Sequence, residues 1–283
     1  MSRRSRAELA GVILGDASPV AVMGVINVSP ESFHAGSVYH GEEAVLRAAL
    51  GMVEAGAALI DVGARSSAPY LETGISEAEE TERLVRAVGA LVAKLPVPVS
   101  ADTSRPRVAR AALEAGARVV NDVSALAEPA LARVVTEHDA ALILMAAPGP
   151  GRVLDAPVAS VTRILTTALA AARAAGVPEE RIVLDPGIGF FRDAGVVWHA
   201  WDVAVLAGLP ALAALGRPLC VGVSRKSFVG AITGRDDPAA RLPGSLAATA
   251  AAVLGGAALI RAHDVAETVD AVRVAERVRR AAP

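Results

Sequence analysis

The stretch that decides the fold is residues 106–121, PRVARAALEAGARVVN. Its first ten residues are rich in alanine and predict a helix near 106–115. Gly116 comes next and is typical of a residue that ends a helix before a strand. Val119–Asn121 is a short apolar run that predicts a buried strand. A helix, a glycine turn and a strand are therefore expected in close succession.

The same unit recurs along the chain. Glu54-Ala55-Gly56-Ala57 repeats the turn of Glu114-Ala115-Gly116-Ala117, and Ala175-Gly176-Val177 ends another predicted helix. Strands are predicted at Val20–Ile26, Leu59–Gly63, Val97–Ala101, Val119–Asn121, Ala141–Met145, Ile182–Leu184, Leu219–Val223 and Leu259–Arg261. Helices are predicted near 42–55, 77–94, 106–115, 129–137, 158–175, 197–215, 245–254 and 265–279.

Strict alternation of strands and helices implies that the strands pair in parallel. Eight such units in 283 residues favour closure into one α/β domain, a (β/α)₈ TIM barrel. The structural alternative is an open, doubly wound sheet. We expect residues 1–283 to form a single domain, with residues 1–18 as an N-terminal extension.

The charge balance excludes some classes of partner. The formal net charge is -2, from 28 basic and 30 acidic residues, and aromatic residues make up only 3% of the chain. Such a chain has neither an extended positive field nor stacking platforms, so no nucleic-acid partner is expected. A small anionic ligand is still compatible, because a local site needs only a few cations.

The sequence also argues against export and membrane insertion. Leu242–Ile260 carries no formal charge and is long enough to span a bilayer, but proline and glycines interrupt it. We expect it to form a buried helix, a Gly-Gly turn and the start of a strand. The basic N-terminus is interrupted by Glu8 and does not resemble a secretory signal. Cys220 is the single cysteine, which excludes an intramolecular disulfide. A cytoplasmic protein with no membrane partner is expected.

Polar side chains mark the carboxyl end of every predicted strand except the fifth, which ends in Met145. The loops at this end form the active face of a (β/α)₈ barrel, so polar residues there are candidates for function. In chain order the candidates are Asn27, Asp61, Asp102, Asn121, Asp122, Asp185, Ser224, Arg225, Lys226, Arg261 and His263.

Several candidates also have a structural interpretation. Asp185-Pro186-Gly187-Ile188-Gly189-Phe190 has the proline and glycines of a rigid turn. Asp102 and Asn121 could cap helices, and so could His263. Lys226 could be a solvated surface charge. The other histidines show no metal-ligand spacing, so no protein metal cluster is expected.

Taken in order, the motifs resemble those of dihydropteroate synthase and the wider pterin-binding barrel family. The resemblance runs from about Val20 to Val265. It rests on MGVINVSPESF (23–33), DVG (61–63), SADT (100–103), NDVS (121–124), DPGIGF (185–190), GVSRKSF (222–228) and RAHDV (261–265). The activity that it implies is displacement of pyrophosphate from a dihydropterin methylene group by an aromatic amine.

The resemblance also implies the residues that bind the pterin. Asp185 would accept hydrogen bonds from the 2-amino group and the adjacent ring nitrogen, and Lys226 would donate to the carbonyl side. An analogue that lacks one of these hydrogen-bonding groups would leave a buried polar side chain unpaired, so it would bind more weakly than the pterin. The full set that the resemblance implies is Asp61, Asp102, Asn121, Asp185, Phe190, Gly222 and Lys226.

Pyrophosphate is implied to lie against Asn27, Arg261 and His263. Mg²⁺ would bridge it, with Asn27 as a protein ligand, because magnesium prefers phosphate oxygens and few protein groups. Catalysis would rest on positioning and charge neutralisation by residues that include Lys226, Arg261 and Asp102. Ser227, at a predicted helix start, would receive an anionic group of the amine. The loops with Ser32-Phe33 and Ser66-Ser67 would close over that amine.

The amine side departs from the family pattern. The second loop reads Ala64-Arg65-Ser66-Ser67-Ala68-Pro69 and lacks the family's arginine at Ala68, while Phe191-Arg192 replaces the usual Gly-Lys. The amine therefore stays open between p-aminobenzoate and its ribosyl-phosphate derivative, which leads to methanopterin. The alternative functions are a pterin-dependent methyltransferase with a corrinoid partner and a non-catalytic pterin-binding paralogue. A homodimer through the last helices, near 265–279, is also implied.

Overall fold

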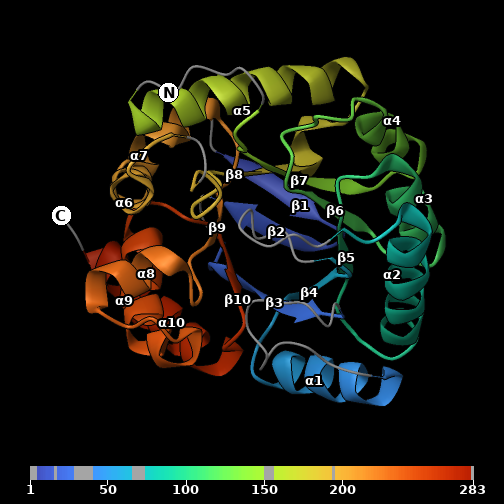
Figure 1. The fold of residues 1–283 in the computed structure, drawn as a ribbon, viewed down its shortest axis with the longest axis horizontal. Helices are drawn as coiled ribbons and strands as arrows, with labels where there is room; N and C mark the ends of the chain where they lie inside the picture. The colour runs from blue at the N-terminus through green and yellow to red at the C-terminus, as the bar shows by residue number, and fades with distance from the viewer. Residues whose placement is uncertain are drawn as a thin grey trace.

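The computed structural model describes residues 5–15, 18–28, 41–65, 74–149, 156–192 and 195–281. A ring of eight parallel strands lies at the centre, and helices surround it (Figure 1). The strands are β3 (Ala21–Asn27), β4 (Leu59–Gly63), β5 (Val99–Asp102), β6 (Val119–Asp122), β7 (Ala141–Met145), β8 (Ile182–Asp185), β9 (Cys220–Gly222) and β10 (Leu259–Ala262). The helices are α1 (Glu42–Glu54), α2 (Glu77–Val92), α3 (Pro106–Glu114), α4 (Ala130–Glu137), α5 (Pro157–Ala174), α6 (Trp198–Ala207), α7 (Leu209–Leu212), α8 (Ser227–Thr233), α9 (Leu242–Leu254) and α10 (Val265–Ala281).

Hydrogen bonds join the strands in the order β8-β7-β6-β5-β4-β3-β10-β9. A parallel bridge between Leu184 and Leu219 links the two ends of this series, where the Leu184 N–H donates to the Pro218 carbonyl at 3.0 Å. The ring is therefore closed. The predicted (β/α)₈ barrel is confirmed, and the open sheet is wrong.

The predicted helix near 197–215 is wrong as a single element. It breaks at Gly208, and α6 and the helical segment Leu209–Leu215 are bent by 64°. Gly208 packs tightly against α5, because a Cβ there would lie 2.3 Å from Val158 Cγ2. Pro210 has no N–H to continue the hydrogen-bond ladder of α6. Among the described residues no single helix is long and apolar enough to cross a membrane, although this bent pair passes by length and composition.

The segment Leu242–Ile260 is helix α9, a glycine turn and the start of β10, as predicted. Glycines with positive φ follow four helices in the same way, at Gly56, Gly116, Gly176 and Gly256. At Gly116 a Cβ would also lie 2.9 Å from Val92 Cγ1. The repeated glycine turn therefore has both a backbone and a packing reason.

Strand side chains alternate between the inside of the ring and the surrounding helices. Met23, Leu59, Val119, Ile143 and Leu259 pack together inside the ring. Their neighbours along the strands belong to the larger core between the strands and the helices. This alternation decides which residue of each strand end faces the barrel axis.

An N-terminal hairpin, which the sequence did not predict, closes one end of the ring. β1 (Arg6–Leu9) and β2 (Val12–Gly15) are antiparallel and lie within the ring of strands (Figure 1). Leu9 and Leu14 are fully buried in the inward apolar cluster. Arg217 also donates to the Arg6 carbonyl. Because that cluster comes from the early part of each strand, the hairpin fills the N-terminal end of the barrel.

Candidate active site

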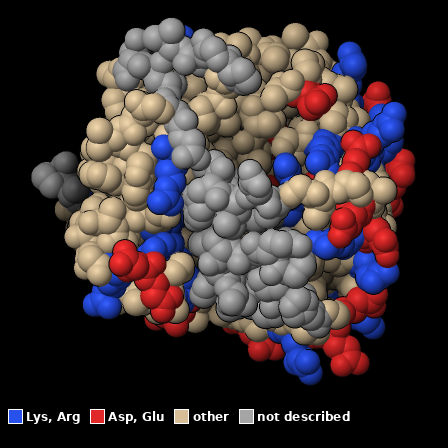
Figure 2. Space-filling view, viewed as in Figure 1, with Lys and Arg blue, Asp and Glu red and all other residues tan. Residues whose placement is uncertain are grey.

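On four strands the inward side chain changes from apolar to polar two residues after the apolar cluster. These pairs are Leu59 and Asp61 on β4, Val119 and Asn121 on β6, Val183 and Asp185 on β8, and Leu259 and Arg261 on β10, while on β5 both members, Ser100 and Asp102, are polar. Parallel strands place all these second members at the same end of the ring. The molecular surface is hollowed on the side seen in Figure 2.

Arg261 joins two acidic strand ends. Its Nε donates to Asp61 Oδ2 at 2.7 Å, and its Nη2 donates to Asp102 Oδ2 at 2.8 Å. Asn121 Nδ2 donates to the same Asp61 oxygen at 3.0 Å. Burial lowers the pKa of Arg261, but Asp61 and Asp102 raise it by more, so the guanidinium stays charged. One cation therefore orients two buried carboxylates, and one of these also accepts from an amide.

This first cluster is rich in oxygen donors. Burial raises the pKa of Asp102 to about 7, although the charge of Arg261 opposes the rise. Asp61 Oδ1 is buried and has no hydrogen-bond partner in the part of the chain that the structure describes. Asn27 Oδ1 and Asp102 Oδ2 both lie beside Gly63, at 3.4 and 3.7 Å from the position of a Cβ on that glycine. Three adjacent strands thus bring carboxylate and amide oxygens together.

A second cluster forms around the loop after β8. Asp185 Oδ1 accepts from the Gly187 N–H at 2.7 Å. Lys226 Nζ donates to the Ile188 carbonyl and lies 4.7 Å from the centre of the Phe190 ring. Burial raises the pKa of Asp185 and lowers that of Lys226, and each group's charge opposes the shift of the other. An acid and a base therefore stabilise each other's ionised forms at the barrel mouth.

β9 lies beneath this second cluster. Cys220 is buried, and burial raises the pKa of its thiol well above the ordinary value, so the thiol stays protonated and opposes the rise in the pKa of Asp185. Gly222 pairs with Arg261 in the sheet. Because Gly222 has no side chain, it leaves space beside Arg261 at the barrel mouth.

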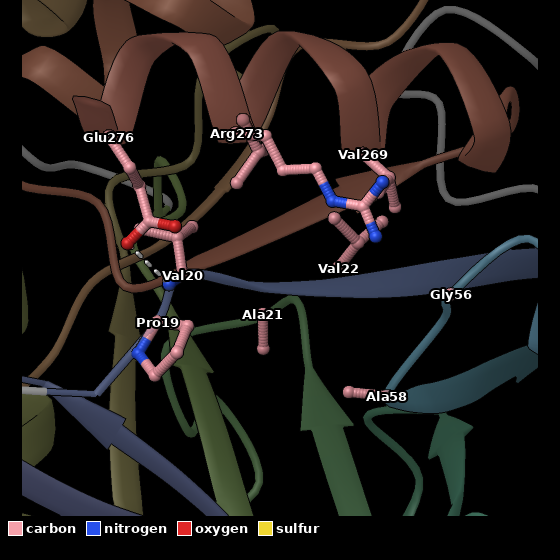
Figure 3. A pocket seen from close by; sticks show the side chains of 10 residues that line it. Pro19, Val20, Ala21, Val22, Gly56, Ala58, Val269, Arg273 and Glu276 are labelled. Carbon is pink, nitrogen blue, oxygen red and sulfur yellow. Dashed lines mark hydrogen bonds between the residues drawn. The ribbon is translucent and has the colours of Figure 1, made fainter. Parts of the chain in front are cut away.

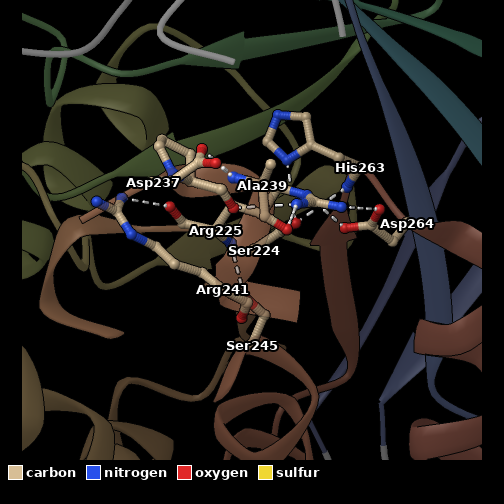
Figure 4. A network of polar contacts seen from close by, with 9 residues as sticks. Ser224, Arg225, Asp237, Ala239, Arg241, Ser245, His263 and Asp264 are labelled. Carbon is tan, nitrogen blue, oxygen red and sulfur yellow. Dashed lines mark hydrogen bonds and ion pairs between the residues drawn. The ribbon is translucent and has the colours of Figure 1, made fainter. Parts of the chain in front are cut away.

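A polar network fixes the turn after β9 (Figure 4). Arg225 has a φ of 56° and donates from Nε and Nη2 to the Asp264 carboxylate at 2.8 and 2.6 Å. Ser224 Oγ lies 3.0 Å from His263 Nδ1. The loop after β9 is therefore bound to the loop after β10, which fixes Lys226 relative to His263.

Arg192 contacts Ser227, the first residue of α8. Its Nη1 donates to Ser227 Oγ at 3.2 Å, and its guanidinium carbon lies 4.7 Å from the centre of the Trp198 ring. The neighbouring Phe191 stacks on Trp201 with ring centres 4.9 Å apart. A cation held by an aromatic face thus stands beside the hydroxyl that was predicted to receive an anionic group.

Buried Glu80 on α2 organises the loops after β4 and β5. The Thr103 hydroxyl donates to Glu80 Oε1 at 2.7 Å, and Arg105 Nη1 lies 2.8 Å from Oε2. Arg65, the arginine of the altered second loop, lies 3.8 Å from the same Oε2. The other predicted loop residues, Ser32, Phe33, Ser66, Ser67 and Ala68, lie outside the described residues, so closure over the amine stays a prediction.

The predicted site residues fall into neighbouring groups at one end of the barrel. Asp102 and Asn121 bond within the first cluster, so they do not cap helices. Asp122 instead accepts from the Ser124 hydroxyl and the Leu126 N–H, which makes it a loop-forming residue. The sequence did not single out Asp202 on α6, whose carboxylate accepts from Gly189. Its signal was the single acidic residue in the otherwise largely apolar helix WHAWDVAVLA.

Another hollow lies where β3 begins, against α10 (Figure 3). Its volume is about 300 Å³, and alanine and valine side chains form much of its wall. Glu276 accepts from the Val20 N–H at 3.0 Å. This hollow lies beside the N-terminal end of the barrel, away from the charged clusters, and none of the predicted site residues line it.

Comparisons with known proteins agree with this geometry. A family model described as "Pterin binding enzyme" matches residues 23–263. The chain is 38% identical to dihydropteroate synthase of Synechocystis over 90% of this chain and 89% of the relative. It is 41% identical to that of Mycobacterium leprae over 91% and 93%. Among solved structures, the Xanthomonas albilineans synthase with 4-aminobenzoic acid superimposes with a TM-score of 0.87 at 40% identity, covering 99% of this chain and 100% of that one. The same enzyme with 7,8-dihydropteroate has a TM-score of 0.84 at 40% identity, with coverage of 98% and 100%.

Proposed function

This chain belongs to the pterin-binding enzyme family, and on that premise we propose that it acts as a dihydropteroate synthase. An arylamine nitrogen bonds to the methylene carbon of 6-hydroxymethyl-7,8-dihydropterin pyrophosphate. The bond from that carbon to the pyrophosphate oxygen breaks, and the nitrogen loses a proton. The observation that carries the proposal is the pair of charged clusters at the open end of the barrel.

The second cluster suits the pterin ring. The 2-amino-pyrimidine edge of a pterin offers N–H donors, and the buried Asp185 carboxylate is an acceptor for them. Asn121, from the neighbouring first cluster, both donates and accepts, and Lys226 can donate to the ring carbonyl. Phe190 supplies an apolar surface beside the ammonium group. A ring without this donor pattern would leave buried charges unpaired, so binding would discriminate strongly.

The end of β10 suits the leaving group. Arg261 is held in place by Asp61 and Asp102, so it needs no reorganisation as negative charge develops on pyrophosphate. His263 lies two residues after Arg261. A hydrogen bond between its Nδ1 and the Ser224 hydroxyl holds the ring in place. We propose that Arg261, Lys226 and Asp102 touch the reacting groups. Positioning and charge neutralisation then supply the rate enhancement.

We also propose that Mg²⁺ accompanies the pyrophosphate, with Asn27 as a protein ligand. The hard oxygen donors near Gly63, Asn27 Oδ1 and the carboxylates, fit magnesium, which needs few protein ligands when a phosphate supplies others. A bound ion would neutralise part of the leaving-group charge. Chelation should abolish turnover, and magnesium should restore it. Pyrophosphate should raise the melting temperature more with magnesium present than without it.

For the amine we propose p-aminobenzoate. Arg192 beside Ser227 supports an amine with an anionic group, since a guanidinium and a hydroxyl can bind a carboxylate together. The related synthases solved with 4-aminobenzoic acid and 7,8-dihydropteroate favour p-aminobenzoate over its ribosyl-phosphate derivative.

The decisive assay measures pyrophosphate release from the dihydropterin substrate with each amine. Release with p-aminobenzoate supports the proposal. Release only with the ribosyl-phosphate derivative would mean that this derivative, and not p-aminobenzoate, is the substrate. Methyl transfer from a methylated pterin to a corrinoid protein, without pyrophosphate release, would establish the methyltransferase instead. Pterin binding without either turnover would leave a binding paralogue.

We further propose a cytoplasmic homodimer that forms through α9 and α10. Leu254, Val274 and Val278 are 49%, 66% and 55% exposed, which is unusual for aliphatic side chains and typical of a contact surface. Sedimentation should show a dimer that V274D with V278D converts to monomers.

The proposed pyrophosphate ester is highly charged and does not cross a bilayer unaided, which supports a cytoplasmic site of action.

A further inference from the structure

One peptide group in the loop after β8 lies between an acid and a base. The peptide joins Ile188 to Gly189. Its carbonyl oxygen accepts from Lys226 Nζ, and its N–H donates to Asp202 Oδ1 at 2.8 Å. Because the N–H and C=O of a trans peptide lie in its plane and point in opposite directions, Asp202 and Lys226 bind opposite edges of one rigid peptide group. A rotation of this plane would break both bonds.

The packing leaves the loop little room to compensate. Asp202 is 1% exposed, and a Cβ on Gly189 would lie 2.8 Å from Lys226 Cδ. Asp202 Oδ2 is buried and accepts no hydrogen bond from the described residues. The carboxyl group is therefore attached to this region through the Gly189 N–H and through the charge of Lys226.

We propose that Asp202 is a positioning residue for the reaction, which fixes the Ile188–Gly189 peptide and thereby holds Lys226 beside Asp185. This inference rests on the proposed function of the site, because it assigns Lys226 to pterin binding. Asp202 does not touch the substrate in this scheme. Its effect reaches the pterin through the peptide and the lysine.

The position of Asp202 also predicts a pH dependence. Burial raises its pKa to about 6, opposed by the Gly189 N–H and by the charges of Lys226 and His199. Above that pH the carboxylate is ionised and binds the peptide strongly, and below it the bond weakens. The other charged groups on the surrounding elements are Asp185 at the end of β8, Arg192 in the loop after it, and Arg163 and Arg173 on α5, while α8 and α9 carry none.

Folding stability should respond in the opposite direction. Because the folded-state pKa of Asp202 is raised above the unfolded value of 3.8, protonated Asp202 stabilises the fold fully below pH 3.8. That contribution is lost as the pH rises through about 6. D202N should therefore melt higher than the wild type at pH 8, with a smaller difference at pH 4.5. If Asp202 acted only through stability, the pterin affinity of the wild type would not fall on acidification, whereas the proposal predicts that it declines near pH 6 while the stability contribution of Asp202 grows.

The test compares the wild type with D202N, D202A and the control D270N, whose carboxylate on α10 is exposed. Pterin binding is measured from pH 5 to 8.5 by fluorescence titration, which needs no turnover. D202A should weaken binding about 10- to 100-fold at pH 8, as expected for loss of a charge-assisted hydrogen bond. D202N should stay within about 3-fold of the wild type at pH 8, because the amide oxygen still accepts, but should lack the decline near pH 6.

Wild-type affinity in folded D202A would overturn the proposal, and so would an unchanged acidic decline in D202N. If D202A does not fold, the pH profile of D202N decides alone. Failure of the proposed function would look different. The wild type would then release no pyrophosphate with any arylamine, while the binding titrations would still test Asp202.

Discussion

The two ends of the barrel interior are built from the same strands but have opposite chemistry. At the N-terminal end Leu59, Val119 and Leu259 pack around the hairpin leucines in a closed apolar layer. At the C-terminal end Asp61, Asn121 and Arg261 take the equivalent inward places two residues later. Two residues along each strand therefore separate the apolar layer that closes one end of the barrel, here called the apolar floor, from the charged pocket at the other end. The comparison teaches that stability and chemistry occupy adjacent layers of one structure.

The charged layer is costly to bury, and the shifted pKa values show it. Burial raises the pKa of Asp102 to about 7 even with Arg261 at 2.8 Å. Buried acids of this kind are tolerated when rigid surroundings fix them and function requires them. The apolar floor supplies that rigidity, so changes in the two layers should have separable effects.

The largest expected effect is from R261M, which breaks the charged layer. Turnover should fall about 100- to 1,000-fold, the usual cost of removing a preorganised donor from a developing negative charge. Pyrophosphate release measures it, with circular dichroism as the check on folding. R273M, at an exposed position on α10, serves as a control and should leave turnover unchanged. Wild-type turnover in R261M would contradict the role of β10 at the leaving group.

A change in the apolar floor should act on stability instead. L14A removes a fully buried hairpin side chain and should cost about 2–5 kcal/mol of unfolding free energy. Urea unfolding measures the loss, and turnover of the folded protein should stay within about 2-fold, since the charged layer is unchanged. I232A, at an exposed position on α8, is the control and should cost less than about 1 kcal/mol. A large fall in kcat for folded L14A would show that the two layers are not separable.

A smaller effect should come from the edge of the charged pocket. R192A should raise KM for p-aminobenzoate about 10-fold and leave kcat unchanged, because the charge-assisted contact is to a remote part of the amine. Aniline, which lacks the carboxylate, should be used equally by both proteins. If R192A raised KM for aniline as much as for p-aminobenzoate, Arg192 would be a structural residue only.

The smallest effect should come from the boundary between the layers, where the protonated thiol of Cys220 opposes the rise in the pKa of Asp185. C220A removes this polar group and should weaken pterin affinity about 2- to 10-fold. C220S keeps a donor and should recover most of the loss. Fluorescence titration of the pterin distinguishes the two variants. Identical losses in both would indicate that packing, and not the polar group, matters here.

The barrel itself could be predicted because its signals are local and repeated. The glycine turns such as Gly116 and the polar residues after each strand depend on the backbone and on strand periodicity, so the sequence carries them directly. The strand ends also pointed to the polar residues that the structure brings together at the barrel mouth, including Asp185 and Arg261.

The remaining features depend on packing between distant segments. The hairpin turns at Ala10-Gly11, which lacks the Asn-Gly or Asp-Gly signal of such turns, and its partners lie across the barrel. The helix break at Gly208 reflects a close approach to Val158 on another helix. Asp202 was missed for the same reason, because its partner Gly189 lies 13 residues away in a loop.

The hairpin has a consequence for biosynthesis. Residues 6–15 leave the ribosome before any strand of the ring, yet the carbonyl of Arg6 is bound by Arg217, which is made 211 residues later. Until β10, the last strand of the ring, has been translated, the ring that receives Leu9 and Leu14 cannot close. The nascent chain therefore carries a solvent-exposed apolar hairpin until the ring has been made. We expect docking of this hairpin to be a late, slow folding step that chaperones assist.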